Sequence, residues 1–435
     1  MIRNPVLRIA LPSIVSNITV PLLGIADTAI SGHMGSPAVV GALAVGGMLF
    51  NTLFWLFAFL RMSTSGLTAQ ALGRGDCQAI LRYLRTGLQK AFAYGAIILL
   101  LSPVILRVSL FFIAPEAEIG LLSSTYFHIC IWGLPAVLAT VVMAGWYVGM
   151  GNTRIPMYVS IGQNIVNIML SLFFVYCLGM GISGIALGTA ISTWLAFLFS
   201  YVCHRRVLPE GLMNHGSVSG NVGAGDDNRL SPNVSLPLFM RTLCMIIVHF
   251  IFVSAGSKQG SVTLAANTVI IQLFVVFSYF MDGFANAGEA LVGRAIGGCN
   301  KEMYDTTVRS LFVWGGGIAL LFTALYFVGS GWFLSMFTDS EPVLAEMADY
   351  KAWAVSIPVV SMAAFMWDGI YIGAMRAWYM LLSAALGMAV FLVGCYMLAP
   401  VMGNHGLWLS FVMYLAMRGL VLTFVSRAIV VVGRD

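Results

Sequence analysis

Residues 16–35 read SNITVPLLGIADTAISGHMG, an apolar stretch with the pattern of a membrane-spanning helix. The span contains a single carboxylate, Asp27, and a proline, Pro21. A charge at the centre of a membrane helix is unfavourable by about 2.5–3.5 kcal/mol on insertion scales. Such a residue usually faces a cavity, takes up a proton or pairs with another group, so Asp27 is our first candidate for the ion-coupling group of a transporter.

The composition of the chain is that of a polytopic membrane protein. Of its 435 residues, 60% are hydrophobic and 9% are charged, whereas a soluble domain carries about 25% charged residues. A helix needs about 20 apolar residues to cross a hydrocarbon core. Runs of this kind predict an all-α fold of twelve transmembrane helices, at roughly 6–32, 38–70, 83–107, 121–149, 155–178, 183–204, 236–257, 263–295, 304–328, 344–373, 378–399 and 405–430.

Basic residues are distributed unevenly over this topology. Of the 22 Lys and Arg residues, 17 fall in segments on the side of the N-terminus, Arg241 among them, and three on the other side. The remaining two, Arg61 and Arg418, lie inside helices. The bias places both termini in the cytoplasm of a multi-pass protein of the plasma membrane. The net charge of +5 therefore follows from topology and does not indicate a nucleic-acid partner.

The chain divides into two halves that resemble each other. A polar stretch at 207–235 predicts a flexible cytoplasmic linker between six-helix lobes at 1–206 and 236–435. GWYVGMGNTR at 145–154 matches GIYIGAMRAW at 369–378, with a glycine pair at the same places in both strings. Because six helices return the chain to its starting side, the lobes are expected to be related by a pseudo-two-fold axis along the membrane normal. The alternative is that the halves resemble each other only because glycine-rich helices have similar compositions. We expect the protein to be a monomer.

Polar residues in the first lobe offer hydrogen bonds to Asp27. Asn164, Asn167 and Ser171 are spaced i, i+3, i+7, so they share one helix face, and Thr189 lies at a similar depth on the next helix. A conformational change that altered these hydrogen bonds would load and release a proton. An aspartate that is permanently hydrogen-bonded and only packs the lobe is the alternative.

Two prolines lie on the helix that carries Asp27. Pro12 and Pro21 each remove a helical hydrogen bond and favour a kink. A bend of this helix would be able to respond to protonation of Asp27, although a static kink explains the prolines equally well.

The second lobe carries three intramembrane carboxylates, which would attract a cation. Asp282 and Glu289 are spaced i, i+7 on one helix face, and Asp368 adjoins the glycine pair of another helix. Arg61 and Arg418 would neutralise two of these charges, as structural pairs or as a gate. A gate between Arg61 and Glu289, from corresponding helices of the two lobes, is one candidate.

Signatures of enzymes are absent from the sequence. There is no HExxH spacing, no GxxxxGK[ST] loop and no soluble segment large enough for a catalytic domain. We therefore expect no enzyme activity, cofactor or metal site. The partners expected are amphiphilic or cationic small molecules and membrane lipids.

Five stretches of the sequence resemble the multidrug and toxic compound extrusion (MATE) family, in particular its DinF-type bacterial branch. The strings are ALPSIVSNITVPLLGIADTAISGHMGS, FLRMSTSGLTAQALG, NIVNIMLS, DGFANAGEALVG and WDGIYIGAMRA. The resemblance covers essentially the whole chain. It implies cation-coupled export of cationic or amphiphilic drugs through a V-shaped cleft, and efflux-based drug resistance.

The resemblance also implies roles for single residues. Asp27 matches the proton site of the DinF-type branch, Asn167 and Thr189 match its asparagine and threonine, and Pro12 matches the proline at which the first helix bends. Ser171 departs from the family, which often has a second aspartate there. The sodium-coupled branch uses second-lobe carboxylates, including one on its seventh helix. The seventh predicted helix here, at 236–257, contains no carboxylate, although Asp368 is present elsewhere in the second lobe. Proton coupling is favoured, and sodium coupling stays open.

Other functions predict other residues. A lipid-linked oligosaccharide flippase of the same superfamily needs a cationic cleft, whereas intramembrane carboxylates outnumber intramembrane arginines here by four to two. A membrane enzyme acting on lipids needs a cluster of nucleophiles or metal ligands, which is not visible. The prediction is a proton-coupled antiporter, with the flippase and a sodium-coupled exporter as alternatives.

Overall fold

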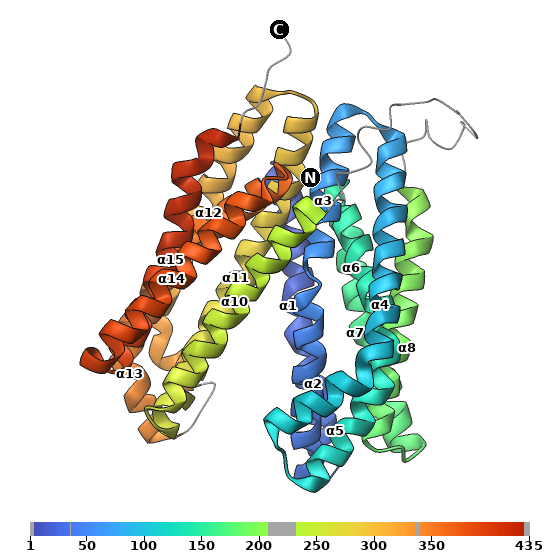
Figure 1. Ribbon diagram of the computed structural model, residues 1–435, viewed down its shortest axis with the longest axis vertical. Coiled ribbons are helices and arrows are strands. Elements are labelled where there is room, and N and C mark those ends of the chain that lie inside the picture. Colours follow the sequence, from blue (N-terminus) through green and yellow to red (C-terminus); the bar gives the residue numbers. More distant parts are fainter. Residues whose placement is uncertain (1–3, 35, 208–231, 336–339, 430–435) are drawn as a thin grey trace. The chain divides into compact units, whose positions relative to one another are not determined.

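A computed structural model describes residues 4–34, 36–207, 232–335 and 340–429, which form helices without any strand (Figure 1). Twelve stretches among them are long and apolar enough to cross a membrane, and each overlaps one of the predicted spans. The elements are α1 (Pro5–Gly32), α2 (Pro37–Leu56), α3 (Phe59–Arg74), α4 (Cys77–Ile113), α5 (Ala117–Cys130), η1 (Ile131–Gly133), α6 (Leu134–Gly149), α7 (Arg154–Leu172), η2 (Phe173–Cys177), α8 (Ile182–Cys203), η3 (His204–Arg206), α10 (Pro232–Ser257), α11 (Ser261–Gly297), α12 (Lys301–Ser335), α13 (Glu341–Gly373), α14 (Ala377–Met402), α15 (Asn404–Phe424) and η4 (Val425–Ala428).

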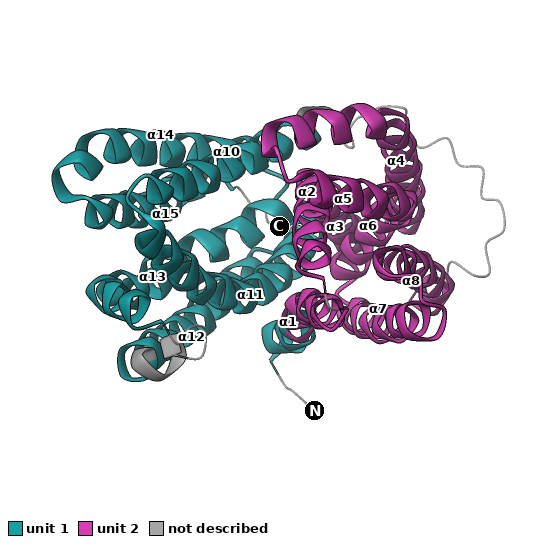
Figure 2. Ribbon diagram, turned by 90° about the horizontal axis from the view of Figure 1, so that it is seen from below, with its two compact units in different colours: residues 1–14, 231–435 teal, residues 15–230 magenta. Residues whose placement is uncertain are grey.

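Two compact units divide the chain (Figure 2). Unit 1 consists of residues 1–14 and 231–435, and unit 2 of residues 15–230. The division falls inside α1, whose first turns pack on α11 of unit 1. Gly283 makes this contact possible, because a Cβ at that position would lie 3.0 Å from the carbonyl oxygen of Ala10. The N-terminal lobe predicted at 1–206 therefore differs from unit 2 at its beginning, since residues 1–14 belong to unit 1.

The predicted linker at 207–235 falls mostly on residues 208–231, which lie outside the described residues. Its C-terminal end differs from the prediction, because α10 already begins at Pro232. Proline is well tolerated at the first position of a helix, where its missing N–H has no intrahelical acceptor.

Glycines at matching positions bring helices into close contact in both units. In unit 2, a Cβ at Gly149 of α6 would lie 2.5 Å from the carbonyl oxygen of Ser65 on α3. In unit 1, a Cβ at Gly373 of α13 would lie 2.9 Å from that of Glu289 on α11. A single sequence offset relates both members of the first contact to those of the second. The repeat seen in the sequence is therefore also a repeat of helix packing.

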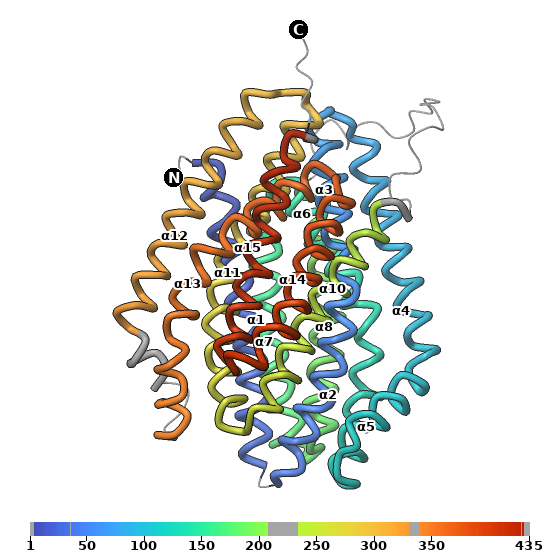
Figure 3. The backbone as a smooth tube through the Cα atoms, turned by 60° about the vertical axis from the view of Figure 1, so that its left-hand side comes forward, coloured from blue at the N-terminus to red at the C-terminus, as the bar shows by residue number. Residues whose placement is uncertain are grey.

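Helices of unit 2 are interrupted where those of unit 1 are continuous. The second span of unit 2 breaks between α2 and α3, and its fourth contains the 3-10 turn η1 between α5 and α6. The corresponding helices of unit 1, α11 and α13, run without a break (Figure 3). The fifth span of unit 2 ends in the π-helical turn η2. Turns of this type are frequent at functional sites.

Candidate functional site

Asp27 lies in the part of α1 that belongs to unit 2, and it is buried, with 7% of its surface exposed. The surrounding sequence is apolar, and a membrane favours a helix because most of its backbone hydrogen bonds are made within the segment. The Oδ1 atom of Asp27 is buried and has no hydrogen-bond partner among the described residues. A carboxylate in such surroundings is unfavourable while it carries its charge.

The predicted partners Asn167, Ser171 and Thr189 meet each other between α7 and α8. The Asn167 side-chain amide donates hydrogen bonds to the hydroxyl of Thr189 at 3.0 Å and to that of Ser192 at 3.3 Å. Ser171 in turn donates to the Asn167 side-chain oxygen at 3.4 Å. The helices approach closely because Gly188 faces Ser171, where a Cβ would lie 2.6 Å from the serine hydroxyl oxygen. None of these bonds ends on Asp27.

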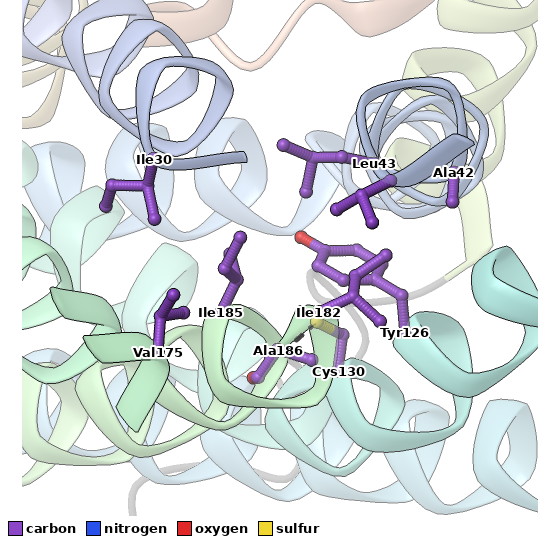
Figure 4. Packing of buried hydrophobic residues seen from close by; sticks show 10 residues of the cluster. Ile30, Ala42, Leu43, Tyr126, Cys130, Val175, Ile182, Ile185 and Ala186 are labelled. Carbon is purple, nitrogen blue, oxygen red and sulfur yellow. Dashed lines mark hydrogen bonds between the residues drawn. The ribbon is translucent and has the colours of Figure 1, made fainter. Parts of the chain in front are cut away.

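Tyr126 of α5 links this network to Asp27. Its side chain lies near Thr189 and Cys130, and Asp27 lies close enough to interact electrostatically with both Tyr126 and Cys130. The ring belongs to a buried cluster in which the hydroxyl points among Ile30, Leu43 and Ile185 (Figure 4).

The position of the Tyr126 ring is fixed by packing. A Cβ at Gly46 of α2 would lie 2.5 Å from the Cδ1 atom of Tyr126, so only glycine leaves room for the ring. Sequence reasoning missed Tyr126. Its available signal was the internal repeat, because the offset that relates Gly149 to Gly373 also relates Tyr126 to Tyr350.

Asn164 lies apart from Asp27 and joins α7 to α1 at another level. Its side-chain amide donates to the carbonyl oxygen of Thr19 at 2.6 Å, and the Thr19 and Ser160 hydroxyls are hydrogen-bonded at 2.8 Å. The predicted set of Asn164, Asn167 and Ser171 is therefore divided between two contacts, one with α1 and one with α8.

The two prolines of α1 flank the point where the helix passes from one unit to the other. Pro12 lies in the part that belongs to unit 1 and Pro21 in the part that belongs to unit 2, with the division after Ile14. Each proline lacks the N–H that would bond the carbonyl group four residues earlier. The intrahelical hydrogen bonding of α1 is thus weakest on either side of this division.

The carboxylates of unit 1 have different surroundings. Asp282 is exposed on α11, Glu289 is fully buried on the same helix, and Asp368 on α13 is 7% exposed. Asp368 forms ion pairs with two arginines through its Oδ2 atom, with Arg418 at 2.6 Å and with Arg241 at 2.5 Å. Pairing of Arg418 with an acidic group was expected.

Arg241 requires a correction. Its sequence position placed it with the basic residues of the cytoplasmic side, whereas it is 4% exposed and contacts Asp368. The reason is that α10 begins at Pro232, so Arg241 lies more than two turns into the helix. Arg61 and Glu289 belong to different units, and their pairing stays a prediction.

The chain is similar to known proteins over most of its length. Residues 12–173 and 237–397 match the MatE family. The chain is 35% identical to DNA damage-inducible protein F of Escherichia coli K12 over 422 residues, 97% of this chain and 91% of the relative. It is 25% identical to a probable multidrug resistance protein NorM of Agrobacterium fabrum, over 94% of this chain and 90% of that protein.

Solved structures share the fold. A multidrug resistance MATE family transporter of the MOP superfamily, in an outward-facing conformation, has a TM-score of 0.85 at 19% identity, over 99% of this chain and 96% of that chain. A MOP superfamily transporter from Pyrococcus furiosus, described as having a binding pocket of reverse polarity, has a TM-score of 0.85 at 20% identity, over 98% of this chain and 95% of that chain. Together with the sequence matches, these findings show that the chain belongs to the MatE family of multidrug and toxic compound extrusion transporters.

Proposed function

We propose that this protein is a proton-coupled antiporter that exports lipophilic, often cationic compounds across the plasma membrane, with Asp27 as its proton site. The observation that carries the proposal is the buried Oδ1 atom of Asp27, which has no hydrogen-bond partner in the described part of the chain. Family membership supports transport rather than catalysis. The name of the NorM relative, a probable multidrug resistance protein, supports drug-like substrates.

Protonation of Asp27 from the outer side is the step that we assign to substrate release. The neutral acid would be able to donate a hydrogen bond that the carboxylate cannot. Tyr126 interacts electrostatically with Asp27 and would be able to respond, and since it lies near Thr189 the response would reach α8. Since α1 contributes to both units, a change in its course between Pro12 and Pro21 would reach each of them. Return to the inward-facing state then delivers the proton to the cytoplasm.

The proposed orientation has both termini in the cytoplasm, as the distribution of basic residues favours. The protein is expected to act as a monomer, because each cycle needs only the two repeated halves of one chain. Accessibility of a cysteine introduced near either terminus, in intact cells and in inverted vesicles, tests the orientation. Labelling from the outside of intact cells would contradict it.

Transport in reconstituted vesicles tests the coupling. Wild-type protein should export an ethidium-type lipophilic cation when a pH gradient is imposed and should not respond to a sodium gradient. Asp27→Asn should abolish the response to the pH gradient. Asp305→Asn, which removes an exposed carboxylate of α12, is the matched control and should retain it. Transport driven by a pH gradient in the Asp27→Asn variant would disprove the coupling site, and transport driven by sodium alone would disprove the coupling ion.

A flippase for lipid-linked oligosaccharides is the second candidate, because Arg241 adds a buried arginine that the sequence count had placed outside the span. This raises the intramembrane arginines to three, against four carboxylates. Both buried arginines of unit 1 are nevertheless paired with Asp368, which leaves less positive charge for a pyrophosphate group. Saturable binding of a prenyl pyrophosphate, with no transport of lipophilic cations, would favour the flippase.

A further inference from the structure

Asp368 is the centre of a buried cluster that ties three helices of unit 1 together. Arg241 of α10 and Arg418 of α15 both donate through Nη2 to the same oxygen, Oδ2, at 2.5 and 2.6 Å. The three side chains are 5%, 4% and 10% exposed. The cluster therefore lies away from water, where ionic interactions are strong.

The two cations of the cluster are permanent. A guanidinium group does not deprotonate in proteins, so Arg241 and Arg418 carry their charge at every pH at which the protein is folded. Two positive charges beside one carboxylate repel a further cation. The Oδ2 atom of Asp368 is thus shared by two guanidinium groups.

Arg418 has further contacts besides its ion pair with Asp368. The guanidinium carbon of Arg418 lies 5.5 Å from the centre of the Tyr414 ring, and its Nη1 donates to the Tyr414 hydroxyl at 3.5 Å. Asp282 of α11, which is exposed, also interacts electrostatically with Arg418. Arg418 is therefore held by Asp368 of α13 and by Tyr414 of its own helix.

The internal repeat places other residues at the positions of unit 2 that correspond to Arg241 and Asp368. With Pro237 aligned on Pro12, the position of Arg241 corresponds to Ser16, and the offset of the glycine contacts relates Asp368 to Ala144. The buried carboxylates of the two units thus occupy unrelated positions. They are not two copies of one ion site.

We propose that Arg241 and Arg418 are built-in cations of unit 1, which occupy Asp368 throughout the transport cycle so that this carboxylate adds no second coupling ion. The cluster acts as a fixed clamp of α10, α13 and α15. The proposal deepens the proposed function, on which it rests for the role of Asp27. Two independent measurements distinguish a failure of this proposal from a failure of the proposed function.

The first readout is pH-difference infrared spectroscopy of reconstituted protein, which detects the carbonyl stretch of protonated carboxylic acids. The variant D368N/R418Q removes one charge of each sign and keeps the net charge of the cluster. We expect its carboxylic acid signal to match that of the wild type at every pH. Loss of a titrating carboxylic acid band in this variant would overturn the proposal. The proposed function alone predicts that Asp27→Asn loses a carboxylic acid band. If Asp27→Asn loses no band, the proposed function is contradicted but the proposal for Asp368 is not.

The second readout is equilibrium binding of radioactive sodium to purified protein. Wild type and D368N/R418Q should show no saturable sodium binding that differs between them, whereas R241Q/R418Q, which leaves Asp368 without its cations, should gain a titrating carboxylic acid band or a sodium site. Sodium binding that the wild type shows and D368N/R418Q lacks would overturn the proposal, as would a folded R241Q/R418Q variant that gains neither signal.

Size-exclusion chromatography verifies that each variant is folded. Should R241Q/R418Q fail to fold, D368N/R418Q decides. Arg418→Lys, which keeps the positive charge, gives a further test: it should behave as the wild type in both readouts, and a new sodium site or carboxylic acid band in it would contradict the role assigned to charge.

Discussion

Asp27 of unit 2 and Phe252 of unit 1 occupy equivalent positions of the internal repeat. Each follows a proline at the same separation, Pro12 in α1 and Pro237 in α10, and the side chains are 7% and 2% exposed. Phe252 packs against Trp408 and Phe411, with ring centres 4.9 and 5.2 Å away. At the same place in two similar bundles, one unit has an aromatic core and the other a buried acid.

The surroundings of these residues differ in the same direction. Gly181 and Gly403 precede α8 and α15 with φ of 58°, and this register relates Thr189 to Phe411. A tyrosine is present at the equivalent position of both units, Tyr126 in unit 2 and Tyr350 in unit 1. At these two positions unit 2 has polar side chains and unit 1 has aromatic ones, although Trp408 beside Phe252 donates to the buried Asn267. A buried polar group lowers stability unless it is hydrogen-bonded, so we expect the cost of burying Asp27 to be retained for function.

The buried acids of the two units show the opposite contrast. Asp27 and Asp368 are equally buried, each 7% exposed, but Asp368 contacts two arginines, whereas none of the ion pairs described in the structure includes Asp27. Irregular helix segments accompany the uncompensated acid, and continuous helices accompany the compensated one. Unit 2 is therefore the part in which we expect changes of protonation and conformation.

The largest effect on stability is expected from Asp368→Asn. The substitution leaves two buried guanidinium groups without their carboxylate, and breaking a buried ion pair from one side is destabilising by about 3–5 kcal/mol. Asp27→Asn should change the free energy of unfolding by less than about 1 kcal/mol, because no ion pair is lost. Chemical unfolding in detergent micelles measures both, and D368N/R418Q should recover part of the loss. Equal effects of the two aspartate substitutions would break the comparison.

Smaller and similar effects are expected at glycines that the repeat places at equivalent contacts. A Cβ at Gly145 would press on the backbone of α3, and one at Gly369 on the backbone of α11. Overpacking of this kind is destabilising by about 1–3 kcal/mol, so Gly145→Ala and Gly369→Ala should lower stability alike.

Gly317→Ala is the control for these substitutions, since nothing lies within 4 Å of its Cβ position on α12. Alanine is favoured over glycine inside helices by roughly 0.5–1 kcal/mol, so this variant should be slightly stabilised. The same unfolding assay applies. A loss at Gly145 without a loss at Gly369 would show that the repeat does not extend to this packing.

Much of the fold was predictable from the sequence, because membrane helices are recognisable as long apolar runs. The break between α2 and α3 inside such a run was not predicted. The glycine contacts were predictable for a related reason, since one sequence offset joins the glycines that serve the same packing in each unit. The assignment of residues 1–14 to unit 1 was not, because contiguity in sequence says nothing about which neighbour a helix turn packs on.

Parts of the candidate site were predictable for reasons of spacing. Asn167 and Ser171 share a helix face at i, i+4 and do meet. Asn164 lies a turn earlier and bonds Thr19 instead, which depends on where two helices cross. Tyr126 and Arg241 escaped notice because a tyrosine near an apolar cluster and an arginine near a helix end are ordinary at the sequence level. Their roles depend on partners far away in the chain.

A modest effect on stability is expected from Tyr126→Phe, and its matched control is Tyr350→Phe. The two tyrosines are equivalent in the repeat, and both are buried, 6% and 8% exposed. Phenylalanine keeps the ring that packs on Gly46 and removes only the hydroxyl group, which lies near Thr189 and Cys130. A hydrogen bond contributes about 0.5–1.5 kcal/mol, so both variants should remain folded with a modest loss of stability.

Transport separates the two tyrosine variants. Tyr350 donates to the Glu346 carboxylate at 3.0 Å, which Thr263 also contacts at 2.9 Å, so its loss leaves that carboxylate hydrogen-bonded. Tyr126 has the uncompensated Asp27 as its acidic neighbour, and its hydroxyl is the group that we expect to respond to protonation. Tyr126→Phe should slow transport driven by a pH gradient by up to about tenfold, the equivalent of about 1.4 kcal/mol, while Tyr350→Phe should transport at the wild-type rate. Equal slowing of both variants would mean that the hydroxyl groups serve packing in each unit, and that the polar character of unit 2 is not what couples transport to the proton.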